Sequence, residues 1–322
     1  MKKLITILCV LAMIVSLCAC GASDAPAASS AGGYSVGICQ LVQHPALDAA
    51  TQGFKDALVD KLGDDVSFIE QNASGDSATC ATICSQLVSE EVDLILANAT
   101  AALQAASAAT NEIPILGTSI TDYGTALGAE DWTGVSGTNI SGTSDLAPLD
   151  GQAQMISEMF PDAKNIGLLY CSGEPNSKYQ ADVIAPMLEE LGYSVSAYTF
   201  ADSNDVASVT ASACADCDVL YIPTDNTAAS CTEAINNVAQ PAGIPIVAGE
   251  EGICAGCGVA TLSIDYYDLG WATGEMAAEI LADGADVSTM EVRYAPKFEK
   301  KFNADICSAL GITAPADYVA IG

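Results

Sequence analysis

The sequence predicts an α/β fold of two lobes, each a doubly wound parallel sheet, joined by crossover strands. Short apolar segments of strand length alternate with helical patterns of about ten or more residues, as in parallel sheets with right-handed crossovers. The series repeats along the chain, with matching strands about 130 residues apart. Both halves contain the segment Ile-Pro-Ile, at 113–115 and 244–246. Two copies of one alternating unit predict two lobes of similar construction.

The first half is organised around a buried strand predicted at 36–42, a nearly continuous apolar run typical of strands covered on both faces. It ends in the polar turn Gln43-His44-Pro45, and Pro45 suits the first turn of a helix. Open α/β sheets place ligands at such strand-to-helix turns, and this turn holds the chain's only histidine. Further strands are predicted at 66–71, 92–97 and 113–117, and helices at 78–89 and 101–110.

The second half follows the same plan after a Gly/Ser/Thr-rich boundary at 136–148, where little periodicity is visible. Strands are predicted at 166–170, 194–200, 219–222 and 244–248, and helices at 179–191, 205–215 and 228–238. A third crossover is expected near 263–265, followed by a helix at 269–281 whose small residues allow close packing.

The first 20 residues are expected to be a targeting segment. Lys2 and Lys3 precede the apolar stretch 4–17, and Leu17-Cys18-Ala19-Cys20 resembles the cleavage site of a bacterial lipoprotein, with acylation at Cys20. An uncleaved anchor helix or a plain secretory signal is the alternative. Residues 21–33 are rich in Ala, Ser, Pro and Gly and predict a flexible tether.

The charge balance narrows the classes of ligand and partner. Acidic residues number 41 and basic residues 10, so nucleic acid and anionic lipid surfaces are repelled. Arg293 is the only arginine. A bound carboxylate must therefore be held by hydroxyls, backbone N–H groups or helix N-termini rather than by a guanidinium fork.

Several motifs give the chain a family resemblance. It resembles the substrate-binding lipoproteins of ABC importers, in the branch associated with tryptophan, tyrosine and phenylalanine uptake. The matching segments are 43–49 (QHPALDA), 97–102 (ANATAA), 121–122 (TD), 223–227 (PTDNT), 249–252 (GEEG) and 264–270 (IDYYDLG). The loop at 171–177 departs from the family pattern at Gly173 and Pro175, and Cys254 and Cys257 replace residues that are ordinarily charged or glycine.

The resemblance implies the type I fold of periplasmic binding proteins. Residues 34–145 with about 264–286 would form the first lobe, and 146–263 with about 287–322 the second. It further implies an extracytoplasmic, lipid-anchored monomer that closes its lobes on an amino acid, without a cofactor, and delivers it to a membrane permease with its ATPase. A surface adhesin or sensor, and a receptor for a sugar or another metabolite, remain alternatives. An enzyme is disfavoured, because no catalytic triad, phosphate loop or metal triad is recognisable.

An amino acid zwitterion needs two opposite partners in the cleft. The N–H groups of Thr100 and Ala101 with the hydroxyls of Ser119 and Thr121 could hold its carboxylate, and Asp225 or Glu250 its ammonium. Simple N-capping is the alternative for Thr100 and Asp225. The complete set of predicted ligand-binding residues, several of them implied by the matching motifs, is His44, Thr100, Ala101, Ser119, Thr121, Asp122, Glu174, Asn176, Ser177, Thr224, Asp225, Asn226, Glu250 and Asp265.

Two groups of residues keep open interpretations. The ligand side chain could contact Tyr123, Tyr170, Tyr266 or Tyr267, although any of these could instead be packing residues. His44 could contact the ligand or the facing lobe, or only cap its own helix. Ten cysteines follow Cys20. They include two Cys-x-x-Cys pairs, Cys214/Cys217 and Cys254/Cys257, and the distance in sequence between the two pairs is longer than in typical zinc sites. We expect no metal, and either free thiols or one or two disulfides.

Overall fold

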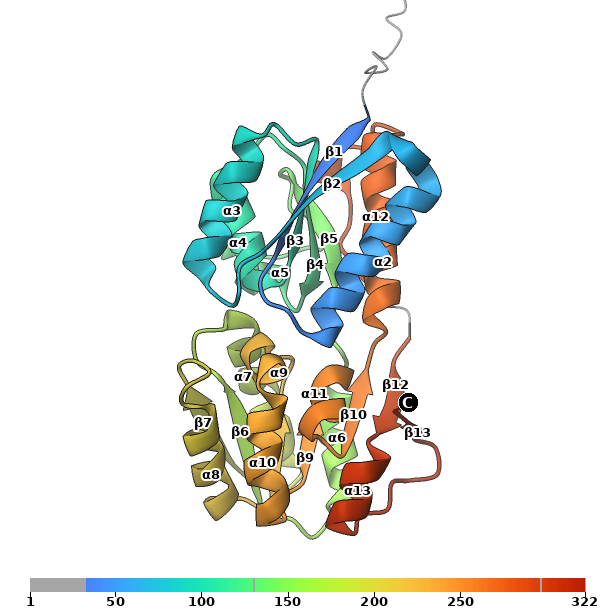
Figure 1. Cartoon of the computed structure of the whole chain (residues 1–322). Coiled ribbons are helices and arrows are strands. Elements are labelled where there is room, and N and C mark those ends of the chain that lie inside the picture. The colour runs from blue at the N-terminus through green and yellow to red at the C-terminus, as the bar shows by residue number, and fades with distance from the viewer. Residues whose placement is uncertain (1–32, 130, 296, 322) are drawn as a thin grey trace, which may run out of the picture. The chain divides into compact units, whose positions relative to one another are not determined.

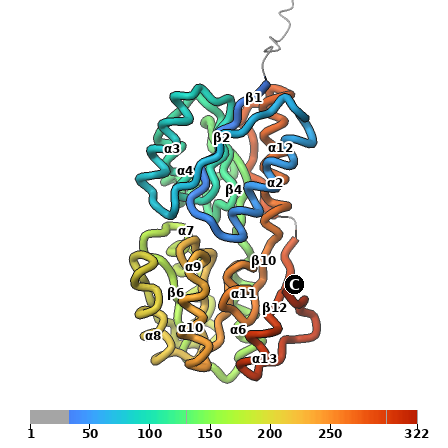
Figure 2. Tube along the Cα trace, viewed as in Figure 1, coloured from blue at the N-terminus to red at the C-terminus, as the bar shows by residue number. Residues whose placement is uncertain are grey.

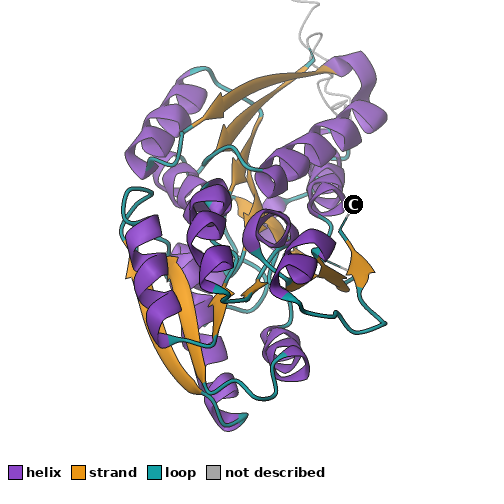
Figure 3. Ribbon diagram, turned by 60° about the horizontal axis from the view of Figure 1, so that its bottom comes forward, coloured by secondary structure: helices purple, strands orange, loops and turns teal. Residues whose placement is uncertain are grey.

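The computed structural model describes residues 33–321 except 130 and 296. The predicted signal segment, the acylation site at Cys20 and the tether up to residue 32 lie outside the described residues. Residues 34–322 cluster as one compact unit. Its strands form two separate sheets with helices packed around them (Figure 1, Figure 3).

The first sheet contains six strands in the order β11-β5-β4-β3-β1-β2, and every pairing in it is parallel. Helices α3 and α4 cover one face, and α2 and α12 cover the other (Figure 1). The strands are β1 (Tyr34–Gln40), β2 (Val66–Asn72), β3 (Leu94–Asn98), β4 (Ile115–Ile120), β5 (Ile140–Ser144) and β11 (Arg293–Tyr294). The helices are α2 (Pro45–Leu62), α3 (Ser77–Ser89), α4 (Thr100–Ala109), α5 (Tyr123–Leu127) and α12 (Tyr266–Leu281).

The second sheet contains seven strands in the order β13-β12-β10-β9-β8-β6-β7, parallel except where β12 runs antiparallel to β10. The strands are β6 (Asn165–Cys171), β7 (Ser194–Phe200), β8 (Val219–Ile222), β9 (Ile246–Ala248), β10 (Ala260–Ser263), β12 (Glu299–Phe302) and β13 (Val319–Ala320). The helices are α6 (Leu149–Met159), α7 (Pro175–Glu190), α8 (Val206–Asp216), α9 (Asn226–Ser230), α10 (Thr232–Ala242), α11 (Glu251–Cys257) and α13 (Ala304–Leu310).

Strand β1 shows why the predicted doubly wound architecture forms. Val36 and Ile38 pack into the cluster that contains Phe54 of α2, whereas Cys39, on the opposite face, packs with Cys80 of α3. Successive side chains of a strand point to opposite faces, so an apolar run is buried only between two helical layers. The α/β prediction with two parallel-dominated sheets is therefore confirmed.

Helices α2 and α12, far apart in the sequence, lie side by side along the first sheet (Figure 2). Small residues make this contact possible. A Cβ atom on Gly270 would lie 1.9 Å from the carbonyl oxygen of Ala50, and one on Gly53 would lie 2.1 Å from that of Tyr267. The helix expected at 269–281 thus does return to the first lobe, and it begins three residues earlier than expected.

The structure corrects three boundaries. The stretch 136–148 was expected to be a boundary, but it contains strand β5. The sequence of β5, Ile-Ser-Gly-Thr-Ser, has no apolar pattern; the buried Thr143 hydroxyl instead forms hydrogen bonds with hydroxyls of neighbouring elements. The helix expected at 228–238 is two helices, interrupted at Cys231. The return to the second lobe, expected at about residue 287, comes later, because β11 at Arg293–Tyr294 still pairs with β5.

Candidate ligand-binding site

Residues that follow strands of both sheets line two separate cavities between the lobes, which together are called the cleft below. A cavity of about 330 Å³ is bounded by Val42 and Ala101 from the first lobe and by Cys171, Glu174 and Asn226 from the second. A second cavity of about 320 Å³ lies between α2 and α11, beside Tyr266 at the start of α12. Both volumes fall near the lower end of the range for small-molecule sites. His44 and Asn226 join the lobes through a contact of 3.2 Å between Nε2 and Oδ1.

The first lobe presents strained backbone and free donors at the ends of β3 and β4. Ala99 has a φ of 88° and Ser119 a φ of 56°, both in the region that non-glycine residues rarely adopt. The hydroxyl of Ser119 is buried and has no hydrogen-bond partner among the described residues. Thr100 is also buried, and with Ala101 it opens α4, where the first N–H groups lack intrahelical partners. Such strain persists where function requires a particular backbone shape.

Asp145, which follows β5, is a buried acidic residue at a strand end that the sequence patterns did not single out. Asp145 is 3% exposed. Its Oδ2 accepts a hydrogen bond of 3.0 Å from the Tyr266 hydroxyl, and its Oδ1 has no partner among the described residues. Burial raises its pKa to about 6, against the opposing effects of the Tyr266 and Thr121 hydroxyls. Only recognition of β5 as a strand would have placed Asp145 at a strand end.

The second lobe holds Glu174 in a dense network. Its Oε1 accepts hydrogen bonds from the backbone N–H (2.8 Å) and hydroxyl (2.7 Å) of Thr227. Its Oε2 accepts hydrogen bonds from the backbone N–H (3.0 Å) and the side-chain amide (2.7 Å) of Asn226. The side-chain amide of Asn176 donates hydrogen bonds to Glu174 (3.2 Å) and to the carbonyl oxygen of Thr224 (3.1 Å). The same carbonyl oxygen also accepts a hydrogen bond from the Ser177 hydroxyl. Asn176, Ser177 and Thr224 thus support Glu174 and the β8 end from within the lobe.

Asp225 and Glu250, the predicted ammonium partners, both cap helices; capping was the alternative interpretation for Asp225 but was not anticipated for Glu250. Asp225 accepts from the N–H groups of Ala228 and Cys171, both at 2.7 Å, and burial raises its pKa to about 8. Glu250 accepts from the N–H groups of Gly252 and Ile253, and burial raises its pKa to about 7. Both carboxylates therefore fix helix starts at the cleft wall.

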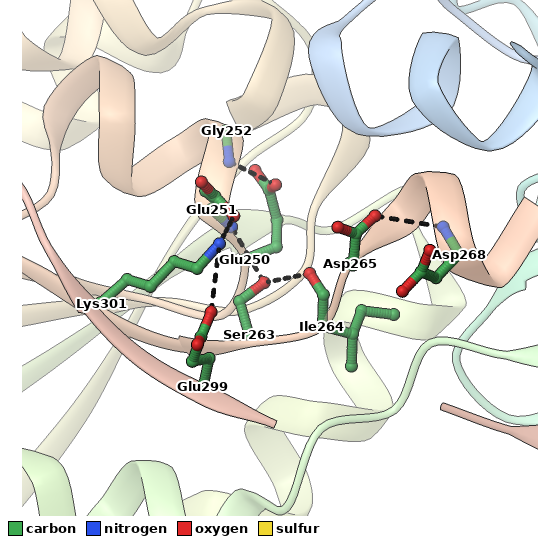
Figure 4. Close-up of polar contacts among 9 residues, drawn as sticks. All are labelled: Glu250, Glu251, Gly252, Ser263, Ile264, Asp265, Asp268, Glu299 and Lys301. Carbon is green, nitrogen blue, oxygen red and sulfur yellow. Dashed lines mark hydrogen bonds and ion pairs between the residues drawn. The ribbon is translucent and has the colours of Figure 1, made fainter. Parts of the chain in front are cut away.

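Two further predicted residues are caps at the cleft margin. Asp122 accepts a hydrogen bond of 2.6 Å from the N–H of Thr125, and Asp265 accepts one of 3.1 Å from the N–H of Asp268 (Figure 4). Asp265 is exposed, unlike the residues around Asp145. The structure thus does not bring it into the buried set.

Lys301 lines the same cavity as Glu250 but forms its ion pairs with other residues. The ammonium of Lys301 points to its neighbours Glu251 and Glu299, at 2.6 and 3.7 Å (Figure 4). In the described part of the chain, no lysine or arginine forms an ion pair with any of four buried carboxylates of the cleft, Asp145, Glu174, Asp225 and Glu250. A site with this much buried acid favours a cationic group on its ligand.

Of the four tyrosines considered for the ligand side chain, Tyr266 alone bonds a buried cleft carboxylate. Tyr123 is a core residue whose hydroxyl donates to the carbonyl of Gly117 at 3.0 Å. Tyr170 packs in the second-lobe core, and Tyr267 is exposed and donates to Asp56 at 3.0 Å.

The ten cysteines in the described residues are free thiols, most of them buried in the cores. No group of histidine, cysteine and acidic side chains suited to a metal ion is found within residues 33–321 as described. In the same part of the chain, none of the helices is both long and apolar enough to cross a membrane.

Comparisons with known proteins agree with this architecture. The family model of ABC transporter substrate binding proteins matches residues 35–320. A tyrosine-binding protein from Clostridioides difficile strain R20291 is 38% identical over 279 residues, which cover 86% of this chain and 80% of that protein.

Two solved structures are also similar. A Streptococcus pneumonia ABC domain in complex with L-Trp superposes with a TM-score of 0.86 at 31% identity, covering 90% of this chain and 100% of that one. The ligand-free, open structure of a Clostridium difficile substrate binding protein with adhesive properties superposes with a TM-score of 0.68 at 38% identity. The match covers 89% of this chain and 99% of that one. Superposition is thus better on the complex, although sequence identity to it is lower.

Proposed function

This chain belongs to the ABC transporter substrate-binding proteins, and from that premise we propose that it captures an aromatic amino acid, tyrosine or tryptophan first, between its lobes. The family is one of binding proteins rather than enzymes, and its fold is that of type I periplasmic binding proteins. Closure of two lobes around a ligand is the motion this architecture permits.

The observation that carries the proposal is the half-satisfied carboxylate of Asp145. Its Oδ2 is held by Tyr266, its Oδ1 is buried without a partner, and no lysine or arginine pairs with it in the described residues. A buried carboxylate needs a hydrogen-bonded cation, because an unpaired charge in the interior is strongly unfavourable. The ammonium of an amino acid supplies both a charge and the missing donor.

The opposite end of the zwitterion has a matching set of neutral donors. The unpartnered hydroxyl of Ser119 and the first N–H groups of α4, at Thr100 and Ala101, lie at the ends of β4 and β3. Helix N-termini favour anions, so a ligand carboxylate can be held there without arginine. Strands β3, β4 and β5 are successive neighbours in the first sheet, which supports the proposal that one ligand contacts both groups of residues.

We place this capture outside the cytoplasm, with the chain anchored by a lipid at Cys20 and acting as a monomer that hands its amino acid to a membrane permease with its ATPase. The leader at 1–20 supports the anchor, and membership of the ABC transporter family supports the importer role. The similar Clostridium difficile protein with adhesive properties keeps surface adhesion as the second candidate.

Calorimetric titration of residues 34–322 with each common amino acid tests the proposal. We expect tyrosine or tryptophan to bind and to raise the melting temperature, since a ligand that binds only the folded state stabilises it. Sugars serve as the matched controls. If saturating aromatic amino acids neither release heat nor move the melting temperature, amino-acid capture is wrong and the adhesin or sensor role takes its place.

A further inference from the structure

The chain's only histidine, His44, contacts the opposite lobe through one ring nitrogen, while its other ring nitrogen has no hydrogen-bond partner in the described part of the chain. His44 is 7% exposed, its Nε2 lies 3.2 Å from Oδ1 of Asn226, and its buried Nδ1 has no hydrogen-bond partner among the described residues. A buried polar atom left without a partner costs about 1–3 kcal/mol, so a native site normally provides one. The binding of ammonium and carboxylate described above leaves Nδ1 unused.

The chemical character of Nδ1 follows from the network behind it. The side-chain amide nitrogen of Asn226 lies 2.7 Å from Oε2 of Glu174, which can only accept from it, so the carbonyl oxygen of Asn226 must face His44. That oxygen is itself only an acceptor, and Nε2 must therefore carry the proton. In a neutral imidazole the other nitrogen is then an acceptor.

The position of His44 suits the far end of a ligand held at Asp145. In the first sheet, β1 and β5 are separated by β3 and β4, and three strand spacings amount to about 14 Å. His44 follows β1 and Asp145 follows β5. An amino acid with an aromatic side chain, extended along this edge with a hydrogen bond of about 2.9 Å at each end, covers a comparable length. One of the cavities is bounded by Val42, two residues before His44, and by Asn226, the hydrogen-bond partner of His44.

We propose that Nδ1 of His44 accepts a hydrogen bond from the polar donor on the ligand's aromatic side chain, a phenol hydroxyl or an indole N–H, and so selects tyrosine and tryptophan over phenylalanine. Asn226 and Glu174 are positioning residues, because they fix the ring tautomer without touching the ligand's donor. The inference rests on the proposed amino-acid binding and adds its specificity. Phenylalanine leaves the acceptor buried and unpaired, whereas the other two ligands satisfy it.

Calorimetry with L-tyrosine, L-tryptophan and L-phenylalanine tests the selectivity on residues 34–322. We expect the unaltered protein to bind tyrosine or tryptophan at least about tenfold more tightly than phenylalanine, the value of one such hydrogen bond. His44→Leu should abolish or reverse the preference, because the donor of tyrosine or tryptophan then has no acceptor, while phenylalanine still binds. Asn226→Ala should reduce the preference in the same direction, and Asn236→Ala, at a second-lobe asparagine remote from His44, should leave it unchanged.

A nitrogen-15 NMR spectrum of the imidazole reads the tautomer directly, since His44 gives the only histidine signals. With saturating L-tyrosine we expect the Nε2–H tautomer with an unprotonated Nδ1, and a mixture of tautomers in Asn226→Ala. An Nδ1–H tautomer, or equal affinities for the three ligands in both the unaltered protein and His44→Leu, would overturn the inference while amino-acid binding stands. Failure of all three ligands to bind would overturn the proposed function and this selectivity with it.

Discussion

Asp145→Asn should make the ligand-free protein more stable and at the same time unable to bind amino acids. Burial raises the pKa of Asp145 to about 6 from an ordinary 3.8, which corresponds to about 3 kcal/mol in favour of the neutral acid. At pH 7.5 the carboxyl group is ionised in both the folded and the unfolded chain, so the folded state carries this penalty in full. Asparagine keeps an acceptor for the Tyr266 hydroxyl and carries no charge. We therefore expect the free energy of unfolding to rise by up to about 3 kcal/mol at pH 7.5.

The pH dependence of that gain identifies its cause. As pH falls through 6 and then below about 4, Asp145 becomes neutral in both states, so the advantage of Asp145→Asn should shrink and vanish. Urea unfolding at pH 7.5 and pH 3.5 measures it, with Asp162→Asn, at an exposed turn, as the matched control that should change stability by less than about 0.5 kcal/mol. Calorimetry should detect no amino-acid binding by Asp145→Asn. Unchanged affinity in this variant, or destabilisation at pH 7.5, would refute the assignment of Asp145 as the ammonium partner.

Three further outcomes are expected. The dissociation constant for L-tyrosine should be constant above pH 7 and rise up to about tenfold per pH unit below pH 6, because the ammonium requires an ionised Asp145. Calorimetry from pH 5 to 8 measures this profile, and a constant value throughout would contradict the prediction. Tyr266→Phe should weaken L-tyrosine binding about tenfold, since it frees the second oxygen of Asp145; equal affinity would show that the hydroxyl does not orient that carboxylate. Gly270→Ala should lower the melting temperature by several degrees, because its Cβ would lie 1.9 Å from the Ala50 carbonyl oxygen. The control Ala272→Ser, at a half-buried position of the same helix, should leave the melting temperature unchanged. An unchanged melting temperature in Gly270→Ala would mean that α2 and α12 separate freely.

The fold could be predicted because its signals are local and repeated. Strand β1 is apolar on both faces, Pro45 begins α2, and the two Ile-Pro-Ile segments mark equivalent strands. Strand β5 could not be predicted, since its stability comes from tertiary hydrogen bonds. The hydroxyl of Thr143 contacts those of Thr118 and Thr273, on β4 and α12, at 3.3 and 2.8 Å. A strand of serine, glycine and threonine looks like a linker until its neighbours are known.

The position of the polar cleft residues at strand ends could be predicted, but the hydrogen bonds that they make could not. Asp225 and Glu250 stand at strand ends just as an ammonium partner would, yet their oxygens accept hydrogen bonds from nearby backbone N–H groups. Sequence spacing does not tell a cap from a ligand contact, because both need an acidic residue at the same junction. Asp145 differs only in what surrounds it, namely Tyr266, which follows it by 121 positions.

The arrangement of the four buried carboxylates also limits which ligands the cleft can accept. Glu174, Asp225 and Glu250 accept hydrogen bonds from helix starts and neighbouring amides, whereas Asp145 keeps a bare oxygen. A neutral sugar could donate a hydroxyl to Asp145 but would leave its buried charge uncompensated, and a ligand with net negative charge would add repulsion from the ionised members of this set. A zwitterion brings one cation to Asp145 and keeps its own anion at the neutral donors of Ser119 and α4. Under the proposed function, electrostatics thus favours amino acids before any side-chain contact is made, and the unpaired nitrogen of His44 would then distinguish among the aromatic ones.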